Sequence, residues 1–229
     1  MTSCRVLSLA AVMLIPLPAS AAETLWTEIV VRVYDSTGVS VPERTSALQI
    51  ARSIVAGASV ELVWRICDGP ARPEPTPGRR RGDSCQAPLA PGELALRIIR
   101  SAGVPDDGRR ELPLGDALVG EGTGGVLATV YADRVEWMAA RTGVNVRQLL
   151  GRAIAHELGH LLMATSLHAS DGLMRPVWSQ SEIRRGHGRD WTFRPREVAA
   201  IQERTRFLAL VATRLPDAGR CELRDAGRC

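Results

Sequence analysis

Residues 145–163 read NVRQLLGRAIAHELGHLLM, a segment in which apolar residues predominate. Asn145 can cap a helix with its side chain, and Gln148 follows three residues later, as in a capping box. The apolar residues that follow recur at helical spacing and form a stripe wide enough for a buried helix. They are Val146, Leu149, Leu150, Ala153, Ile154, Leu158, Leu161 and Leu162. The stretch therefore predicts a long helix packed inside the protein.

Three polar side chains interrupt this apolar helix, namely His156, Glu157 and His160. A spacing of four residues places both imidazoles on one helix face, one turn apart, where they can bind a single zinc ion. Glu157 can then serve as general base towards a zinc-activated water. An ordinary helix that happens to carry two histidines is a poor explanation, because burying unpaired polar groups costs several kcal/mol. The pattern predicts a zinc-dependent hydrolytic site.

A resemblance extends this prediction beyond the helix. The segment from His156 to His160, followed by His168 and then by residues 171–176, DGLMRP, resembles the metzincin metallopeptidases, most closely their matrixin branch. The resemblance implies a zinc peptidase in which His168 is the third zinc ligand and Met174 forms a tight turn beneath the metal. It also implies a zincin-like fold in which the strand at residues 126–131 is the edge strand along which an extended peptide lies.

The spacing departs from the family pattern at two positions. The pattern places the third ligand ten residues after the first histidine, which is Ser166 here, so His168 comes two residues late. Met163 stands where the family usually has a glycine, so the chain is expected to leave the helix differently.

Other residues can compete for the place of third ligand. Glu182 and Glu197 would serve if the site were of the gluzincin type, with a downstream helical glutamate, and His187 is a further alternative. Trp137, Trp178 and Trp191 can line a pocket, although core packing is the favoured use of each.

The rest of the chain mixes strands and helices without regular alternation, which predicts the α+β class, with a small mixed sheet, the active-site helix and a C-terminal helix. Apolar and β-branched runs predict strands at 29–34, 59–67, 94–99 and 126–131, and helical patterns cover 42–56 and 195–210. Residues 68–92 are rich in Pro, Gly and Arg and predict an exposed loop. Residues 23–229 are thus expected to form one metallopeptidase domain.

The N-terminus predicts export. Arg5 is followed by an apolar run, residues 6–17, and by small residues up to 22, which is the layout of a cleaved signal peptide at residues 1–22. No later stretch is apolar enough to predict a membrane span. Four cysteines then remain, and proximity favours the disulfides Cys67–Cys85 and Cys221–Cys229. The expected location is the periplasm or the extracellular space.

Charge does not indicate a nucleic-acid partner. The formal net charge is +4 and every basic residue is an arginine, but no nucleic-acid-binding motif accompanies them. The protein is expected to be an endopeptidase that uses Zn²⁺ and Glu157. Its expected partner is a peptide or protein substrate. The alternatives are a non-catalytic exported zinc-binding module and the gluzincin-type peptidase.

Overall fold

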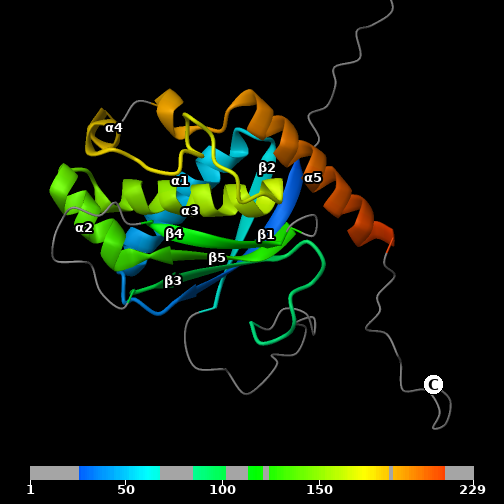
Figure 1. Ribbon diagram of the computed structural model, residues 1–229. Helices are drawn as coiled ribbons and strands as arrows, with labels where there is room; N and C mark the ends of the chain where they lie inside the picture. Colours follow the sequence, from blue (N-terminus) through cyan, green and yellow to red (C-terminus); the bar gives the residue numbers. More distant parts are fainter. Residues whose placement is uncertain (1–25, 68–84, 102–112, 121–123, 186–187, 215–229) are drawn as a thin grey trace, which may run out of the picture.

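A mixed five-stranded sheet forms the base of the molecule in the computed structural model, which describes residues 26–67, 85–101, 113–120, 124–185 and 188–214 (Figure 1). The sheet order is β2-β1-β3-β5-β4. Strands β1, β2, β3 and β5 are parallel, whereas β4 runs antiparallel to β5 at one edge. The strands are β1 (Thr27–Asp35), β2 (Val60–Ile66), β3 (Leu94–Ile99), β4 (Gly115–Gly120) and β5 (Gly124–Tyr131).

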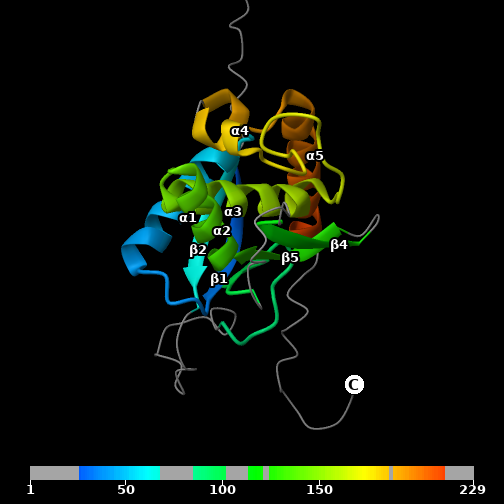
Figure 2. The same cartoon turned by 60° about the vertical axis from the view of Figure 1, so that its left-hand side comes forward.

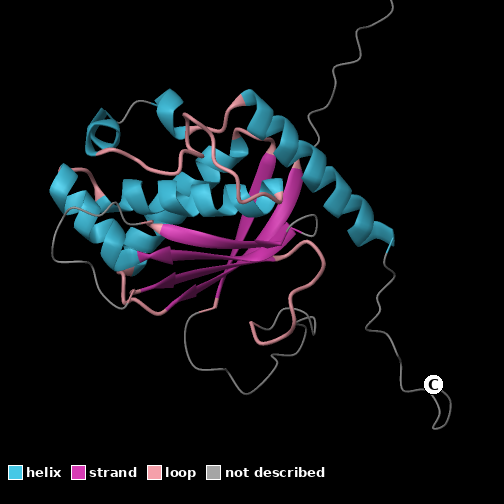
Figure 3. Cartoon of the chain, viewed as in Figure 1, coloured by secondary structure: helices cyan, strands magenta, loops and turns pink. Residues whose placement is uncertain are grey.

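The long helices lie on one side of this sheet in both views (Figures 1 and 2). Coloured by secondary structure, the same arrangement appears as a helical layer over strands (Figure 3). The helices are α1 (Val41–Ala56), α2 (Ala132–Thr142), α3 (Val146–Met163), α4 (Gln180–Arg185) and α5 (Pro195–Arg214), with a 3-10 turn, η2 (Gly188–Trp191). The predicted α+β class is confirmed. None of these helices has the length and apolar character needed to cross a bilayer.

Helix α3 is the buried axis of the helical layer, as its sequence predicts. The Asn145 side chain caps it by accepting a hydrogen bond from the Arg147 N–H at 2.9 Å. The helix ends at Met163, and Ala164 turns the chain away in the left-handed region, with φ 53° and ψ 41°. The departure from the helix therefore falls on an alanine, one residue beyond the position where the family usually has a glycine.

The end of the predicted loop, residues 85–92, lies against the face of the sheet opposite the helices. Arg32, which is 1% exposed, donates hydrogen bonds to the carbonyl oxygens of Ala87 at 2.6 Å and Pro88 at 3.1 Å. The predicted disulfide between Cys67 and Cys85 is present, with an S–S distance of 2.08 Å. Residues 85–92 are thereby anchored to the sheet.

Several predictions fall on residues outside the described ranges. They are the signal peptide at 1–22, most of the loop at 68–92, the histidine at 187 and the second disulfide, Cys221–Cys229.

The structure adds elements to the order expected from the sequence. Strand β4, helices α2 and α4 and the 3-10 turn η2 were not predicted. The interpretation of residues 126–131 as the edge strand is wrong, because β5 lies between β3 and β4. Strand β4 begins and ends with glycine and contains Asp116, all of which have low β propensity. Its extended form comes from pairing with β5, from Gly115 opposite Val130 to Gly120 opposite Gly124.

Candidate metal centre

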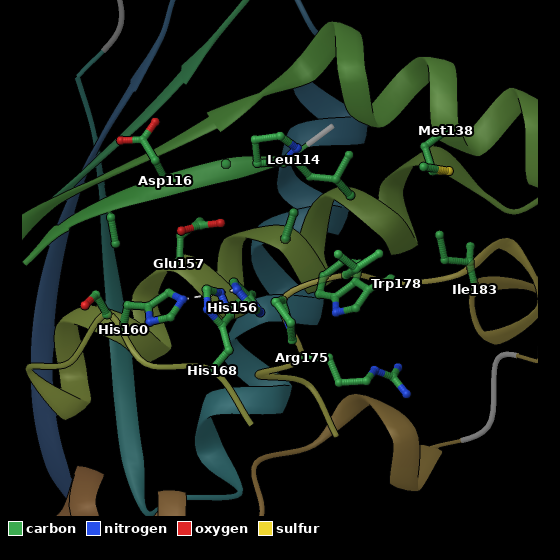
Figure 4. Close-up of a pocket in the computed structure, with 17 residues that line it drawn as sticks. Leu114, Asp116, Met138, His156, Glu157, His160, His168, Arg175, Trp178 and Ile183 are labelled. Atoms are coloured by element: carbon green, nitrogen blue, oxygen red, sulfur yellow. Dashed lines mark hydrogen bonds between the residues drawn. The ribbon is translucent and has the colours of Figure 1, made fainter. Parts of the chain in front are cut away.

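Three imidazoles meet at the C-terminal half of α3. The ring nitrogens of His156, His160 and His168 that are free to bind an ion lie within 4.8 Å of one another. His156 and His160 come from α3 and His168 from the loop that follows it, and Figure 4 shows the three rings together below Glu157. Among the described residues this is the one group of His, Cys, Asp and Glu side chains suited to holding a metal.

The tautomers of the two helical histidines follow from their hydrogen bonds. The Nδ1 atom of His156 lies 2.8 Å from the Leu173 carbonyl oxygen, and that of His160 lies 2.8 Å from the Thr165 carbonyl oxygen. A carbonyl oxygen only accepts hydrogen bonds, so each Nδ1 carries the proton and donates it. Each Nε2 is then left with a lone pair, which is the form that binds metals.

The distance between these two lone pairs fits a metal. The Nε2 atoms of His156 and His160 are 3.2 Å apart. Two nitrogens bound at 2.0–2.1 Å to one tetrahedral zinc ion lie about 3.3–3.4 Å apart. Burial lowers the pKa of His156 to about 3 and also lowers the pKa of His160, so neither ring supplies a proton to bridge the pair at neutral pH. A cation bound by both Nε2 atoms would remove the repulsion between these two lone pairs.

The loop after α3 brings His168 to the pair. The His168 ring stacks on His156 at 5.3 Å between centroids and meets the His160 ring edge-on at 4.7 Å. The loop closes in a tight turn in which the Ala169 N–H donates to the Met174 carbonyl oxygen at 2.8 Å. Met174 is 1% exposed, so the turn methionine expected from the family resemblance is buried.

Gly159 makes this packing possible. A Cβ atom at Gly159 would lie 2.7 Å from the Met174 sulfur and 2.7 Å from Phe193 Cε1. The small residue between the two histidines therefore lets the methionine turn approach the helix directly.

We expect Gly159→Ala to lower the free energy of unfolding by about 1–3 kcal/mol, because the added methyl group overpacks the buried contact. Chemical denaturation measures the change. Gly188→Ala is the control, since a Cβ there meets nothing within 4 Å. Equal stability of both variants and the wild type would contradict this account of the turn.

Glu157 lies between the histidines and the edge strand. Its side chain is 6% exposed, and a Cβ at Gly115 of β4 would come within 2.7 Å of its Cγ and Oε1 atoms. Burial, together with the negative charge of Asp116, raises the pKa of Glu157 to about 8. A nearby cation favours the charged form of a carboxyl group, which opposes this shift. Glycine at 115 thus makes room for the carboxylate beside the candidate metal position.

Neither glutamate proposed as an alternative ligand joins the three histidines. Glu182 accepts hydrogen bonds from Arg175 at 2.8 Å and from the Ser179 N–H at 2.8 Å. Glu197 accepts from the Arg194 N–H at 2.7 Å. Each carboxylate accepts a hydrogen bond from the backbone N–H three residues earlier, just before its own helix, as the glutamate of a capping box does.

A cavity of about 410 Å³ opens beside the three histidines (Figure 4). The polar side chains that line it are those of Asp116, Glu157, the three histidines, Ser166 and Arg175. The apolar part of its lining consists of Pro113, Leu114, Ala117, Met138, Ala153, Pro176, Val177, Trp178 and Ile183. Its volume lies in the range of sites that bind small ligands or one large side chain.

Three elements that line this cavity were not predicted from the sequence. Strand β4 supplies Gly115 and Asp116, α2 supplies Met138, and α4 supplies Ile183. Trp178, for which core packing was favoured, lines the cavity, while Trp191 is 3% exposed within the core. The sequence signal that could have placed Trp178 at the site is its position four residues after Met174, the expected turn methionine.

No protein-family model and no curated protein sequence matches the chain. Solved structures with a similar fold include an archaemetzincin from Methanopyrus kandleri, with 15% identity, a TM-score of 0.47 and coverage of 82% of this chain and 99% of the other. Another is a zinc-dependent peptidase from Methanocorpusculum labreanum, with 14% identity, a TM-score of 0.47 and coverage of 75% and 99%. At this similarity, the functional assignment depends on the residues of the site itself.

Proposed function

We propose that the protein is a zinc-dependent metallohydrolase, and specifically an endopeptidase, with His156, His160 and His168 as zinc ligands and Glu157 as general base. The observation that carries the proposal is the pair of Nε2 lone pairs 3.2 Å apart, each oriented by a backbone carbonyl. A buried carboxylate next to that pair adds the group that hydrolysis requires.

Zinc held by the three imidazoles would supply Lewis-acid chemistry, lowering the pKa of a water molecule towards ~7 and polarising the carbonyl under attack. Glu157 takes the proton from the attacking water and delivers it to the leaving amine. The close approach of Gly115 limits the positions that the carboxylate can take. Glu157 is only 6% exposed, and this burial strengthens the electrostatic interactions of its carboxylate.

The substrate is an extended peptide that lies along β4. Among the described residues this strand is the edge of the sheet beside the site, and an exposed edge offers backbone N–H and C=O groups to an added strand. Backbone pairing of this kind recognises the interior of a chain, which supports endopeptidase activity. The apolar part of the cavity is suited to a large apolar side chain next to the scissile bond.

The runner-up is a non-catalytic exported zinc-binding module on the same scaffold. It shares the three histidines, but a purely structural zinc site requires no base at position 157. Export is part of both proposals and is supported by the signal-like residues 1–22 and by the disulfide between Cys67 and Cys85.

We expect the purified protein to contain one zinc ion per chain and to cleave peptides that carry Leu, Met or Phe next to the scissile bond faster than those that carry Asp or Glu. Atomic absorption and a mixture-based peptide library read by mass spectrometry provide the measurements. Removal of zinc by a chelator should abolish cleavage, and added zinc should restore it. Activity that survives complete removal of the metal would reject the metallohydrolase.

A further inference from the structure

One backbone carbonyl links the candidate metal centre to a tryptophan. The Leu173 oxygen accepts a hydrogen bond from His156 Nδ1 at 2.8 Å and a second one from Trp178 Nε1 at 3.2 Å. Leu173 is fully buried, and its own N–H donates to the Thr192 carbonyl oxygen at 3.2 Å. The Leu173 carbonyl, which holds His156, is therefore oriented both by the backbone of the turn and by the indole N–H of Trp178.

The Trp178 ring is itself held from two sides. It meets the His156 ring edge-on, with centroids 5.5 Å apart and an angle of 86°, and it meets the Trp191 ring at 4.9 Å and 89°. The Arg152 guanidinium lies over the Trp191 ring, 4.0 Å from its centroid. Arg152 and His156 are four residues apart on α3, so the chain of contacts begins and ends on the same helix face.

We propose that Trp178 is a positioning residue for His156, an inference that rests on the zinc function proposed above. Its N–H fixes the Leu173 carbonyl and its ring supports the imidazole, so that His156 Nε2 faces the Nε2 atom of His160 before the metal arrives. Groups that hold a metal-ligating histidine in this way fix its tautomer and ring orientation and contribute to metal affinity.

Lining the cavity is a second, separable role of Trp178. A residue that only forms a wall changes how substrates bind and leaves zinc affinity untouched. A residue that positions His156 changes zinc affinity in the absence of any substrate. Zinc affinity measured without substrate therefore distinguishes the two roles.

The test compares Trp178→Phe with Trp64→Phe in the full protein. Both changes keep an aromatic ring and remove an indole N–H. Trp64 lies on β2, at the opposite edge of the sheet from β4, and its Nε1 is buried with no hydrogen-bond partner among the described residues. Competition with a chromophoric zinc chelator gives the dissociation constants. Trp178→Phe should weaken zinc binding roughly 10-fold, the lower end of the range for groups that support a ligand from the outer shell. Trp64→Phe should bind zinc as the wild type does.

The outcomes separate this inference from the proposed function. Wild-type affinity in Trp178→Phe overturns the positioning role while the zinc site stands. An equal loss in both variants also overturns it, since loss of packing then explains the effect; thermal unfolding of the zinc-free proteins measures that loss directly. A wild-type protein with no affinity for zinc overturns the proposed function and this inference together.

Discussion

Glu157→Gln is expected to lower peptide hydrolysis by roughly 10²–10⁴-fold, the usual contribution of a positioned general base. Glutamine keeps the size of the side chain and its capacity to hydrogen-bond, but it cannot accept the proton of the attacking water. The side chain lies in the tight space beside Gly115, so the amide should take the same position as the carboxylate. Zinc content should stay at one ion per chain, because Glu157 is not among the three converging ligands.

Initial rates on a cleaved peptide and metal analysis of the same samples provide the measurements. Glu203→Gln is the matched control, because Glu203 is exposed on α5 and the same change there should leave turnover unaltered. Undiminished turnover in Glu157→Gln would reject the mechanism. A wild-type protein that binds zinc yet cleaves no member of a broad peptide library would favour the non-catalytic module.

His168→Ala is expected to weaken zinc binding by more than about 100-fold, beyond the loss seen when a group outside the ligand shell is removed. The imidazole is one of three that converge within 4.8 Å, and its removal leaves a pair of ligands on one helix. Competition with a chelator measures the affinity. His156→Ala should abolish tight binding altogether, because it also breaks the Nε2 pair.

Ser166→Ala is the matched control for the loop. Ser166 is exposed, lines the same cavity as His168 and occupies the position of the third ligand in the family pattern. Wild-type affinity in His168→Ala would reject the three-histidine site, and Glu182→Gln and Glu197→Gln would then identify the ligand. A loss in Ser166→Ala equal to that in His168→Ala would show that the loop path, rather than the imidazole, sets the affinity.

Local periodicity in the sequence was enough to predict most of the elements on which the site is built. Helix α3 follows from its cap at Asn145 and its apolar stripe, because both depend on residues within one or two turns of each other. Strands β1, β2, β3 and β5 follow from short runs of apolar and β-branched residues. The spacing of His156 and His160 places them on one face wherever a helix forms.

The sequence by itself therefore determined the α+β class, the helix and the pair of histidines with the glutamate between them. The tertiary structure alone decided which strand borders the site, since β4 has little β propensity of its own and is extended through its pairing with β5. It alone decided that His168 joins the pair while Glu182 and Glu197 cap helices, because the path of the loop depends on the left-handed turn at Ala164. Periodicity describes contacts between near neighbours, whereas a loop path and a cavity depend on hydrogen bonds and packing between distant segments.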